Sequence, residues 1–334
     1  MFKAGYFKEL SGNKVKCLLC PHECIINEGK TGLCSVRKNI GGTLISLVYG
    51  KPVAIHIDPI EKKPLYHFYP GQKILSFGTV GCNLKCFFCQ NCEISQATPD
   101  ENLEMERTPE EIIQLAGLNS ENIGIAYTYN EPVIFFEYML DIAKIAAKKG
   151  LKNVVVSNGY INKEPLSELI NFTDAFNIDL KAFSEKFYSS YTHSKLQPVL
   201  DSIKIIKKSG KHLELTHLII PGLNDDLIEF REMIKWIKNE TGEKTVLHLS
   251  RYFPHFRSKL PPTPSDTLIN MYNIAKEELN YTYLGNYQSS SGNDTLCPTC
   301  NNTVIKRSNY QISLSGLDKY GYCIYCGELV IKNI

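Results

Sequence analysis

The chain has 334 residues, 43% of them hydrophobic and 22% charged, which suffices for one large globular domain with small appendages. A formal net charge of +2 is too small to indicate a nucleic-acid or membrane partner. The first residues, MFKAGYFKEL, lack the apolar segment of a signal peptide, and no run of about 18 apolar residues exists to cross a membrane. We therefore expect a cytoplasmic protein.

Cysteine is the most informative residue type in this chain, with twelve copies in three groups of four. The groups are Cys17, Cys20, Cys24 and Cys34; Cys82, Cys86, Cys89 and Cys92; and Cys297, Cys300, Cys323 and Cys326. An even number of cysteines leaves disulfides as an alternative. Close C-x-x-C pairs in a protein without a secretion signal favour metal binding instead.

Residues 1–70 are predicted to form a cysteine-rich metal-binding segment. It offers four soft ligands, which are Cys17, Cys20, Cys24 and Cys34, and His22 is a possible substitute for one of them. Their spacing suits a zinc ion and an iron–sulfur cluster about equally well. Apolar and β-branched residues then predict a strand-like stretch from Thr43 to Ile57.

Residues 71–285 alternate between short apolar stretches and helical periods. The predicted strands are residues 74–80, 123–128, 153–158, 175–180, 213–220 and 245–250. The predicted helices begin at Thr108 or cover residues 132–150, 198–209, 226–239 and 264–279. Such alternation indicates an α/β fold with a parallel sheet. Because a closed eight-stranded barrel needs two more units, we expect a partial (βα)6 TIM-like barrel with its chemistry at the carboxyl ends of the strands.

The second cysteine group lies in the loop after the first of these strands. Cys82, Cys86 and Cys89 have C-x3-C-x2-C spacing, which can wrap three thiolates around a [4Fe–4S] cluster and leave one iron open. The alternative register, Cys86, Cys89 and Cys92, is the start of a ferredoxin run, but that run should continue x3-C-P and here does not. Cys92 is then predicted to be a small, partly buried residue.

Residues 286–334 are predicted to form a zinc-ribbon-like segment. Two C-x-x-C knuckles lie on either side of a β-like stretch: Cys297 with Cys300, and Cys323 with Cys326. Four thiolates close the coordination sphere of zinc, so this site should support folding and not catalysis. A rubredoxin-like iron is the alternative.

The central motif, C-x3-C-x-aromatic-C with Phe88 as the aromatic residue, resembles that of the radical S-adenosylmethionine (SAM) superfamily. The resemblance implies a radical SAM barrel in which the amine and carboxylate of SAM chelate the open iron. It also implies reductive cleavage of SAM to a 5′-deoxyadenosyl radical. In turn, the radical would abstract hydrogen from an unidentified substrate, and an electron donor such as ferredoxin or flavodoxin would supply the reducing electron.

Three later motifs fall at successive strand ends, as in that superfamily. Tyr129-Asn130-Glu131-Pro132 resembles a Gly-Gly-Glu-Pro motif, which implies Glu131 as a partner of the SAM amine. Ser157-Asn158-Gly159 resembles a Thr-Asn-Gly motif that meets the ribose, and Asp179-Leu180-Lys181 resembles the Asp-Leu-Lys of glycyl-radical activases, whose lysine meets the SAM carboxylate. The alternatives are a helix start at Glu131 and a solvated charge at Lys181.

Further motifs resemble a narrower family, the AmmeMemoRadiSam system radical SAM enzymes, which are pyruvate formate-lyase activating enzyme-like. They include Cys17-Leu-Leu-Cys20-Pro-His22, the run from Asp58 to Phe68, and Ser250-Arg-Tyr-Phe-Pro254. The resemblance implies Memo and Amme-type partner proteins and no known substrate. Activation of a glycyl-radical enzyme is one alternative function. A zinc-ribbon nucleic-acid adaptor is another, which the near-neutral charge disfavours.

Two lysines and two histidines are predicted to have surface or structural positions. Lys62 and Lys63 are predicted to lie on a solvated face. His217 and His248 fall within predicted strands and are expected to be hydrogen-bonded structural histidines.

Overall fold

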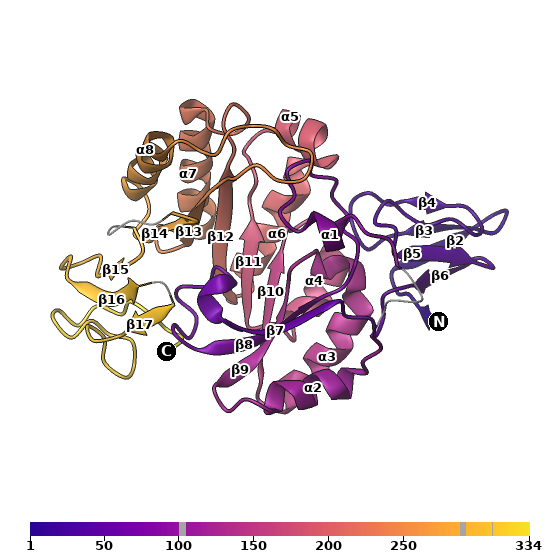
Figure 1. Ribbon diagram of the computed structural model, residues 1–334, viewed down its shortest axis with the longest axis horizontal. Coiled ribbons are helices and arrows are strands. Elements are labelled where there is room, and N and C mark those ends of the chain that lie inside the picture. Colours follow the sequence, from indigo (N-terminus) through magenta and orange to yellow (C-terminus); the bar gives the residue numbers. More distant parts are fainter. Residues whose placement is uncertain (100–104, 288–291, 309) are drawn as a thin grey trace.

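The computed structural model describes residues 1–99, 105–287, 292–308 and 310–334. Figure 1 shows a large central sheet with the N-terminal segment at one end of the molecule and the C-terminal segment at the other. The two flanking cysteine groups therefore lie on opposite sides of the barrel. No helix within the described ranges is long and apolar enough to cross a membrane.

The central sheet has eight strands in the order β14-β13-β12-β11-β10-β9-β8-β7. Its parallel strands are β8 (Lys73–Gly78), β9 (Asn122–Tyr127), β10 (Lys152–Ser157), β11 (Ala175–Asp179), β12 (His212–Ile219), β13 (Val246–Arg251) and β14 (Thr282–Gly285). The six predicted strands are confirmed as β8 to β13. The order has two free ends, so the sheet is an open, partial barrel, as expected.

The two edge strands were not predicted as members of this sheet. β14 is only four residues long and follows directly on the last helix, so its apolar pattern merges with the helical one. β7 (Ala54–Pro59) pairs antiparallel with β8. The single strand predicted from Thr43 to Ile57 is wrong, because β6 (Thr43–Ser46) and β7 belong to different sheets. Gly50, with φ of +75°, turns the chain between them.

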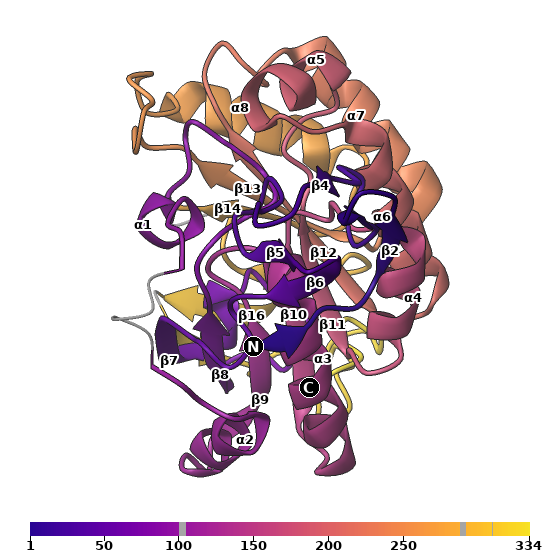
Figure 2. The same cartoon turned by 90° about the vertical axis from the view of Figure 1, so that its right-hand side faces the viewer.

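Helices cover the outer face of the sheet, as Figure 2 shows from the side. They are α2 (Pro109–Gly117), α3 (Phe136–Lys148), α4 (Lys163–Ile170), α6 (Leu196–Lys208), α7 (Leu227–Thr241) and α8 (Ser265–Lys276). Thr108 and Glu111 form a capping box at the start of α2, and Asp226 caps α7. The helix predicted from residue 132 begins as the 3₁₀ turn η2 (Pro132–Phe135). The shorter α4 was not predicted.

The N-terminal segment contains two small antiparallel sheets. One consists of β1 (Phe2–Lys3), β6 and β5 (Arg37–Ile40), and the other of β2 (Phe7–Leu10), β3 (Lys14–Cys17) and β4 (Ile25–Ile26). Their buried residues, Val15, Ile26, Val36 and Leu44 among them, pack into the same hydrophobic core as the barrel helices. The N-terminal segment is thus fixed against the barrel by apolar burial.

The C-terminal segment contains a third small sheet, formed by β15 (Thr295–Leu296), β16 (Thr303–Ser308) and β17 (Gln311–Ser313). Val304, Ile305 and Ile331 form a separate hydrophobic cluster with Tyr281 and Tyr283 of the barrel edge. The segment therefore packs against the β14 side of the sheet, far from the N-terminal segment (Figure 1).

Candidate active site

Three of the four central cysteines open into one large cavity. The loop after β8 places Cys82, Cys86 and Cys89 along its wall, and the cavity has a volume of about 910 Å³. Cys92 lies instead at the first position of the short helix α1 (Cys92–Ser95). The arrangement matches the C-x3-C-x2-C register, in which three thiolates hold a cluster and one iron faces the cavity.

Two of the three thiols, Cys82 and Cys86, lie in surroundings that oppose ionisation in the absence of a cation. Burial raises the pKa of Cys86 to about 11, and burial together with the nearby Glu131 carboxylate raises the pKa of Cys82. The backbone N–H of Leu84 donates to the Cys82 sulfur over 3.3 Å. Cysteine binds metal as the thiolate, so these three residues need iron to offset their negative charge, and they suit an iron–sulfur cluster.

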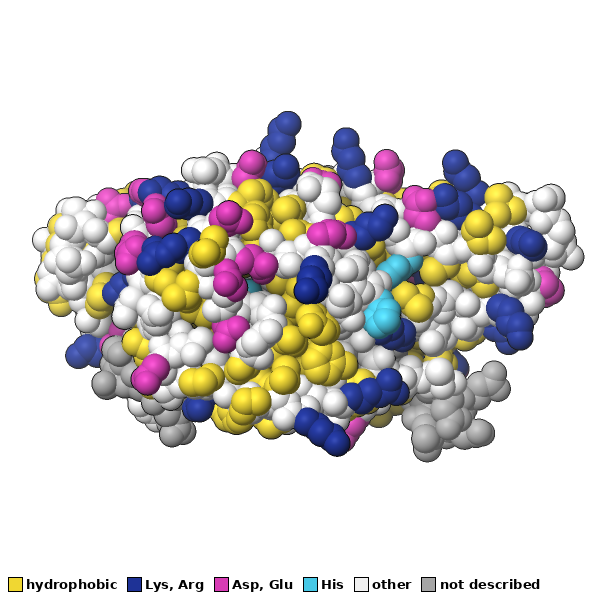
Figure 3. Space-filling model, turned by 90° about the horizontal axis from the view of Figure 1, so that it is seen from above, with side chains coloured by type: hydrophobic (Ala, Val, Ile, Leu, Met, Phe, Trp, Pro, Cys, Tyr) yellow, Lys and Arg dark blue, Asp and Glu magenta, His cyan; other side chains and the backbone are white. Residues whose placement is uncertain are grey.

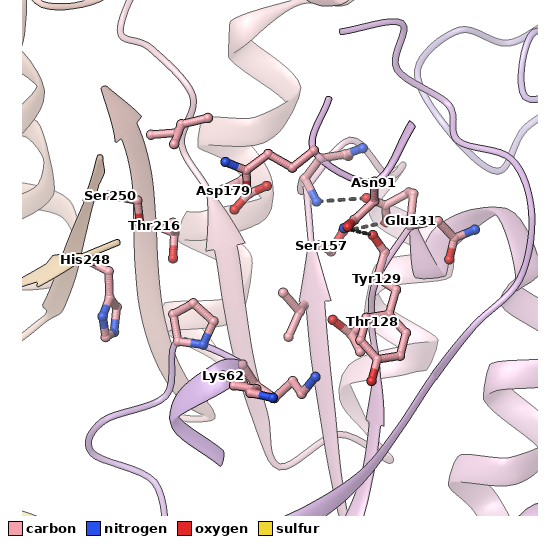
Figure 4. Close-up of a pocket in the computed structure, with 18 of the residues that line it drawn as sticks. Lys62, Asn91, Thr128, Tyr129, Glu131, Ser157, Asp179, Thr216, His248 and Ser250 are labelled. Carbon is pink, nitrogen blue, oxygen red and sulfur yellow. Dashed lines mark hydrogen bonds between the residues drawn. The ribbon is translucent and has the colours of Figure 1, made fainter. Parts of the chain in front are cut away.

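Glu131 lies directly behind this wall, at the start of η2. Its carboxylate accepts hydrogen bonds from the Val133 backbone (3.0 Å), the Ser157 hydroxyl (2.7 Å) and the Asn158 backbone (2.8 Å). Burial raises the pKa of Glu131 to about 7 in spite of these bonds. The interpretation of Asn130-Glu131-Pro132 as a helix start is confirmed, and the same carboxylate also positions the loop after β10 (Figure 4).

Asn158 connects that loop to the cysteine loop. Its side-chain nitrogen donates to the Asn83 side chain over 2.9 Å and lies 3.9 Å from the Cys82 sulfur. The hydroxyl of Ser157 is used twice, as donor to Glu131 and as acceptor from the Gly159 backbone. Glu131, Ser157 and Asn158 therefore act together to hold the cysteine loop and the floor of the cavity in one geometry.

Asp179 is the last residue of β11 and forms an ion pair of 2.7 Å with Lys181 on the cavity wall. Burial opposes the charge on Lys181, but Asp179 and the neighbouring Cys86 outweigh it and raise the pKa of the ammonium group. The Lys181 side chain is only 17% exposed, so the alternative of a solvated charge is wrong. A fixed ammonium group beside the cysteine loop is suited to bind a carboxylate.

Phe88 lies between two of the cysteines and lines the same cavity while remaining 3% exposed. Its ring packs against Phe87 and Phe187, with centroid separations of 5.3 and 6.0 Å. All six residues that the sequence suggested for SAM binding are thus brought to one cavity with the three cysteines: Phe88, Glu131, Ser157, Asn158, Asp179 and Lys181.

The opposite part of the cavity carries charges that the sequence did not reveal. Lys63 is almost fully buried and pairs with Asp58 over 2.7 Å, so its predicted place on a solvated face is wrong, whereas Lys62 is 45% exposed. The Tyr129 hydroxyl also donates to Asp58. Burial opposes ionisation of Asp58, but the bonds from Lys63 and Tyr129 prevail and lower its pKa to about 2.

Glu214 is a second buried acid, located within β12. It accepts hydrogen bonds from His248 (2.6 Å), His212 (2.8 Å) and the backbone N–H groups of Tyr66 and His67. These partners outweigh burial and lower the pKa of Glu214. His248 is therefore a hydrogen-bonded histidine as expected, and it also lines the cavity. A glutamate inside an apolar strand pattern was the signal that could have identified this site.

The C-terminal cysteines form a compact group. The sulfurs of Cys297 and Cys326 are 3.5 Å apart, those of Cys300 and Cys323 are 3.7 Å apart, and all four lie within 4.8 Å of one another. Such a group could hold one metal ion.

The N-terminal cysteines line a second, smaller cavity together with His22. They are Cys17, Cys20, Cys24 and Cys34. All twelve cysteines are free thiols, which is the state that metal binding requires.

Comparisons with known proteins agree with this geometry. The family model of the radical SAM superfamily matches residues 77–237. An uncharacterized protein, MJ0808 of Methanocaldococcus jannaschii, is 43% identical over 333 residues, which are 99% of this chain and 99% of that protein. The chain belongs to the radical SAM superfamily. It is a radical SAM enzyme, and membership implies a [4Fe–4S] cluster and SAM.

More distant relatives are similar to parts of the chain. The pyruvate formate-lyase-activating enzyme of Clostridium pasteurianum is 22% identical over 160 residues, covering 48% of this chain and 67% of that enzyme. Among solved structures, a radical SAM methyltransferase from Sphaerobacter thermophilus has a TM-score of 0.50 at 12% identity, covering 65% of this chain and 67% of that chain. This likeness is one of fold.

Proposed function

We propose that the protein cleaves SAM reductively at a [4Fe–4S] cluster held by Cys82, Cys86 and Cys89. The observation that carries this proposal is that all three thiols and the polar strand ends open into the same cavity of about 910 Å³. When bound there, the cluster would supply the electron for cleavage of SAM to methionine and a hydrogen-abstracting 5′-deoxyadenosyl radical. The three cysteines lie beyond the carboxyl end of β8, which is the usual place for chemistry in barrel folds.

The residues around the cysteines have defined tasks in this proposal. Lys181, held by Asp179, would bind the carboxylate of SAM through a charge-assisted hydrogen bond. Glu131 already accepts three bonds from its own chain, and a carboxylate has about four acceptor positions, so one remains for the SAM amine. Ser157 and Asn158 would meet the ribose, and Phe88 would cover an apolar part of SAM.

The far part of the cavity is proposed to receive the substrate. A volume of about 910 Å³ is near the upper end of small-molecule pockets, which span about 300–1,000 Å³, and the cluster, SAM and the substrate would share it. Lys62 and His248 line this part and would orient polar groups of the substrate (Figure 4).

The test uses the parent protein, purified and reconstituted without oxygen. We expect bound iron and sulfide, formation of 5′-deoxyadenosine and methionine when a reductant and SAM are added, and an electron paramagnetic resonance signal of the reduced cluster that changes on binding SAM. A protein that holds zinc alone, with no sulfide, would be the nucleic-acid adaptor of the alternative hypothesis. Figure 3 shows positive and negative side chains interspersed on the face seen from above, not a basic stripe.

Activation of a glycyl-radical enzyme is a second candidate, favoured by the similarity to the pyruvate formate-lyase-activating enzyme of Clostridium pasteurianum. In this case a glycine of a protein partner would enter the cavity and lose hydrogen. Incubation with a glycyl-radical enzyme from the same organism should then give the doublet signal of a glycyl radical. Production of 5′-deoxyadenosine without that signal would favour another substrate.

Three further assignments complete the proposal. The C-terminal cysteines would hold structural zinc, because a tetrahedral site with zinc–sulfur bonds of about 2.3 Å fits a compact group of sulfurs. A ferredoxin or flavodoxin would donate the electron in the cytoplasm, where thiols stay reduced. Memo and Amme-type proteins would be partners, which co-purification from the native organism can test.

A further inference from the structure

The N-terminal cysteines surround one shared cavity. Cys17 ends β3, Cys20 and Cys24 lie in the loop that leads to β4, and Cys34 lies shortly before β5. Together they line a cavity of about 20 Å³, whose other walls are mostly apolar.

The C-terminal cysteines provide an internal standard for sulfur spacing. Zinc–sulfur bonds of about 2.3 Å in a tetrahedron place the sulfurs about 3.8 Å apart, and the C-terminal pairs are 3.5 and 3.7 Å apart. Within the described ranges, no other three ligand atoms of cysteine, histidine or acidic residues come within 4.8 Å of one another. The N-terminal sulfurs are therefore spread more widely, as they must be when each binds a different iron of a cluster.

A buried cation lines the same cavity and has unused hydrogen-bond donors. Arg37 is 1% exposed and lines the cavity. Its Nη2 donates to Glu137 and to the Gly5 carbonyl, whereas Nε and Nη1 have no partner. Buried donors without partners are costly, and sulfide or thiolate sulfurs of a bound cluster would accept from them. The guanidinium would also offset part of the negative charge of four thiolates.

This cavity is in direct contact with the loop that holds the proposed SAM cluster. Asn83, the residue after Cys82, lines it, and His22 donates from Nε2 to the Asn83 carbonyl over 2.7 Å. On the other side of Cys82, Gly81 packs so closely that a Cβ atom there would lie 2.8 Å from the Cys34 carbonyl. One layer of backbone thus separates the two sets of cysteines.

We infer that Cys17, Cys20, Cys24 and Cys34 hold a second [4Fe–4S] cluster, because these four thiols and Arg37 enclose a cavity that abuts the Cys82 loop. Its place makes it the entry point for the reducing electron. One electron from a low-potential donor of the ferredoxin or flavodoxin type would arrive here and move on to the cluster at Cys82, Cys86 and Cys89. The relay role rests on the proposed function, whereas the identity of the cluster does not.

The identity is tested in a Cys82→Ala/Cys86→Ala/Cys89→Ala variant, in which the SAM cluster cannot form. After anaerobic reconstitution we expect about four iron and four sulfide per chain, and a reduced-cluster resonance signal that SAM does not alter. Adding Cys17→Ala/Cys20→Ala, which leaves only two thiolates at the N-terminal site, should bring iron close to background, whereas adding Cys92→Ala should leave it unchanged. Iron at background before Cys17 and Cys20 are replaced, with about two zinc per chain, would overturn the inference.

The parent protein gives a second measurement that needs no variant. We expect about eight iron and one zinc per chain, and about four iron and two zinc would contradict the second cluster. For the relay, the Cys17→Ala/Cys20→Ala variant is reduced by flavodoxin and quenched by freezing. The SAM cluster should be reduced at least tenfold more slowly than in the parent, and an equal rate would overturn the relay. A parent that holds both clusters but never cleaves SAM would refute the proposed function alone.

Discussion

The two ends of the chain each contribute four cysteines, but their surroundings differ. The C-terminal thiols are packed within 4.8 Å of one another, whereas the N-terminal thiols line a shared cavity with a buried arginine. In each segment one buried arginine adds a polar contact to the apolar packing that holds the segment in place. Arg37 pairs with Glu137 of α3, and Arg307 of β16 donates to the Tyr66 carbonyl.

The difference means that an equal count of cysteines need not imply the same metal. Each segment begins with a C-x-x-C pair, after which the N-terminal segment continues x3-C-x9-C and the C-terminal segment continues x22-C-x2-C. The two segments also differ in where the folded backbone places the sulfurs and in which charges lie beside them. The N-terminal segment also touches the catalytic loop, and the C-terminal segment lies on the other side of the barrel (Figure 1).

The largest effect on activity is expected at the central cysteine loop, which lies between the two segments in the sequence. Cys82→Ala should abolish production of 5′-deoxyadenosine, by about a thousandfold or more, because a cluster with two thiolates is not retained. Cys92→Ala is the matched control, because this residue starts α1, and it should keep activity within about twofold. The assay is chromatography of 5′-deoxyadenosine after anaerobic reconstitution. Full activity in Cys82→Ala with loss in Cys92→Ala would move the site to the ferredoxin register.

Removing a C-terminal ligand should affect stability and leave the chemistry intact. Cys323→Ser should lose one equivalent of zinc and weaken the C-terminal segment by several kcal/mol, because binding free energies of about 10–16 kcal/mol act as folding free energy in small zinc modules. Hydrogen exchange across β16 should rise, while iron and sulfide stay at parental levels. Zinc content equal to that of the parent would contradict the zinc site.

The attachment of the C-terminal segment can be tested at Arg307. It is 8% exposed and donates to the Tyr66 carbonyl and to Thr295, so Arg307→Met should cost about 3 kcal/mol of unfolding free energy. Lys244 pairs with Glu328 on the exposed side of the same junction, and Lys244→Met should cost about 0.5 kcal/mol or less. Denaturant titration measures both, and equal losses would show that the buried arginine is not the main connection.

A smaller effect is expected in the cavity between the segments. Glu131→Gln and Lys181→Met should each weaken SAM binding by roughly ten- to a hundredfold, because a charge-assisted hydrogen bond contributes about 1.5–3 kcal/mol. Neither residue binds iron, so iron and sulfide content should not change. Calorimetric titration of the reconstituted protein decides this, and unchanged affinity in both variants would remove them from the site.

Much of this arrangement could be predicted from local sequence. The parallel strands β8 to β13 appear as separate apolar runs, and the C-x3-C-x2-C register is a property of one short loop. The compact C-terminal group follows from two knuckles on either side of a hairpin-like stretch. In these cases the signal and the structure involve the same few neighbouring residues.

The remainder depends on contacts between distant segments. Lys63 is buried because Asp58 and Tyr129 surround it, and no local pattern distinguishes it from the exposed Lys62 beside it. Glu214 is retained inside an apolar strand by donors from β13 and from residues 66–67. The N-terminal cavity likewise depends on a distant contact, because Arg37 binds Glu137, one hundred residues away. The local sequence around Arg37 therefore does not show that this arginine is buried beside the cysteines.

The backbone at Gly81 has a consequence for how related sequences can vary. A Cβ atom at this position would lie 2.6 Å from a methyl group of Val36 and 2.8 Å from the Cys34 carbonyl oxygen, and φ is +90°, so only glycine fits. A smaller side chain at position 36 would not make room, because the clash with the Cys34 backbone would remain. Position 81 is therefore expected to stay glycine in the history of the family, as a record of contact between two loops that each hold cysteines.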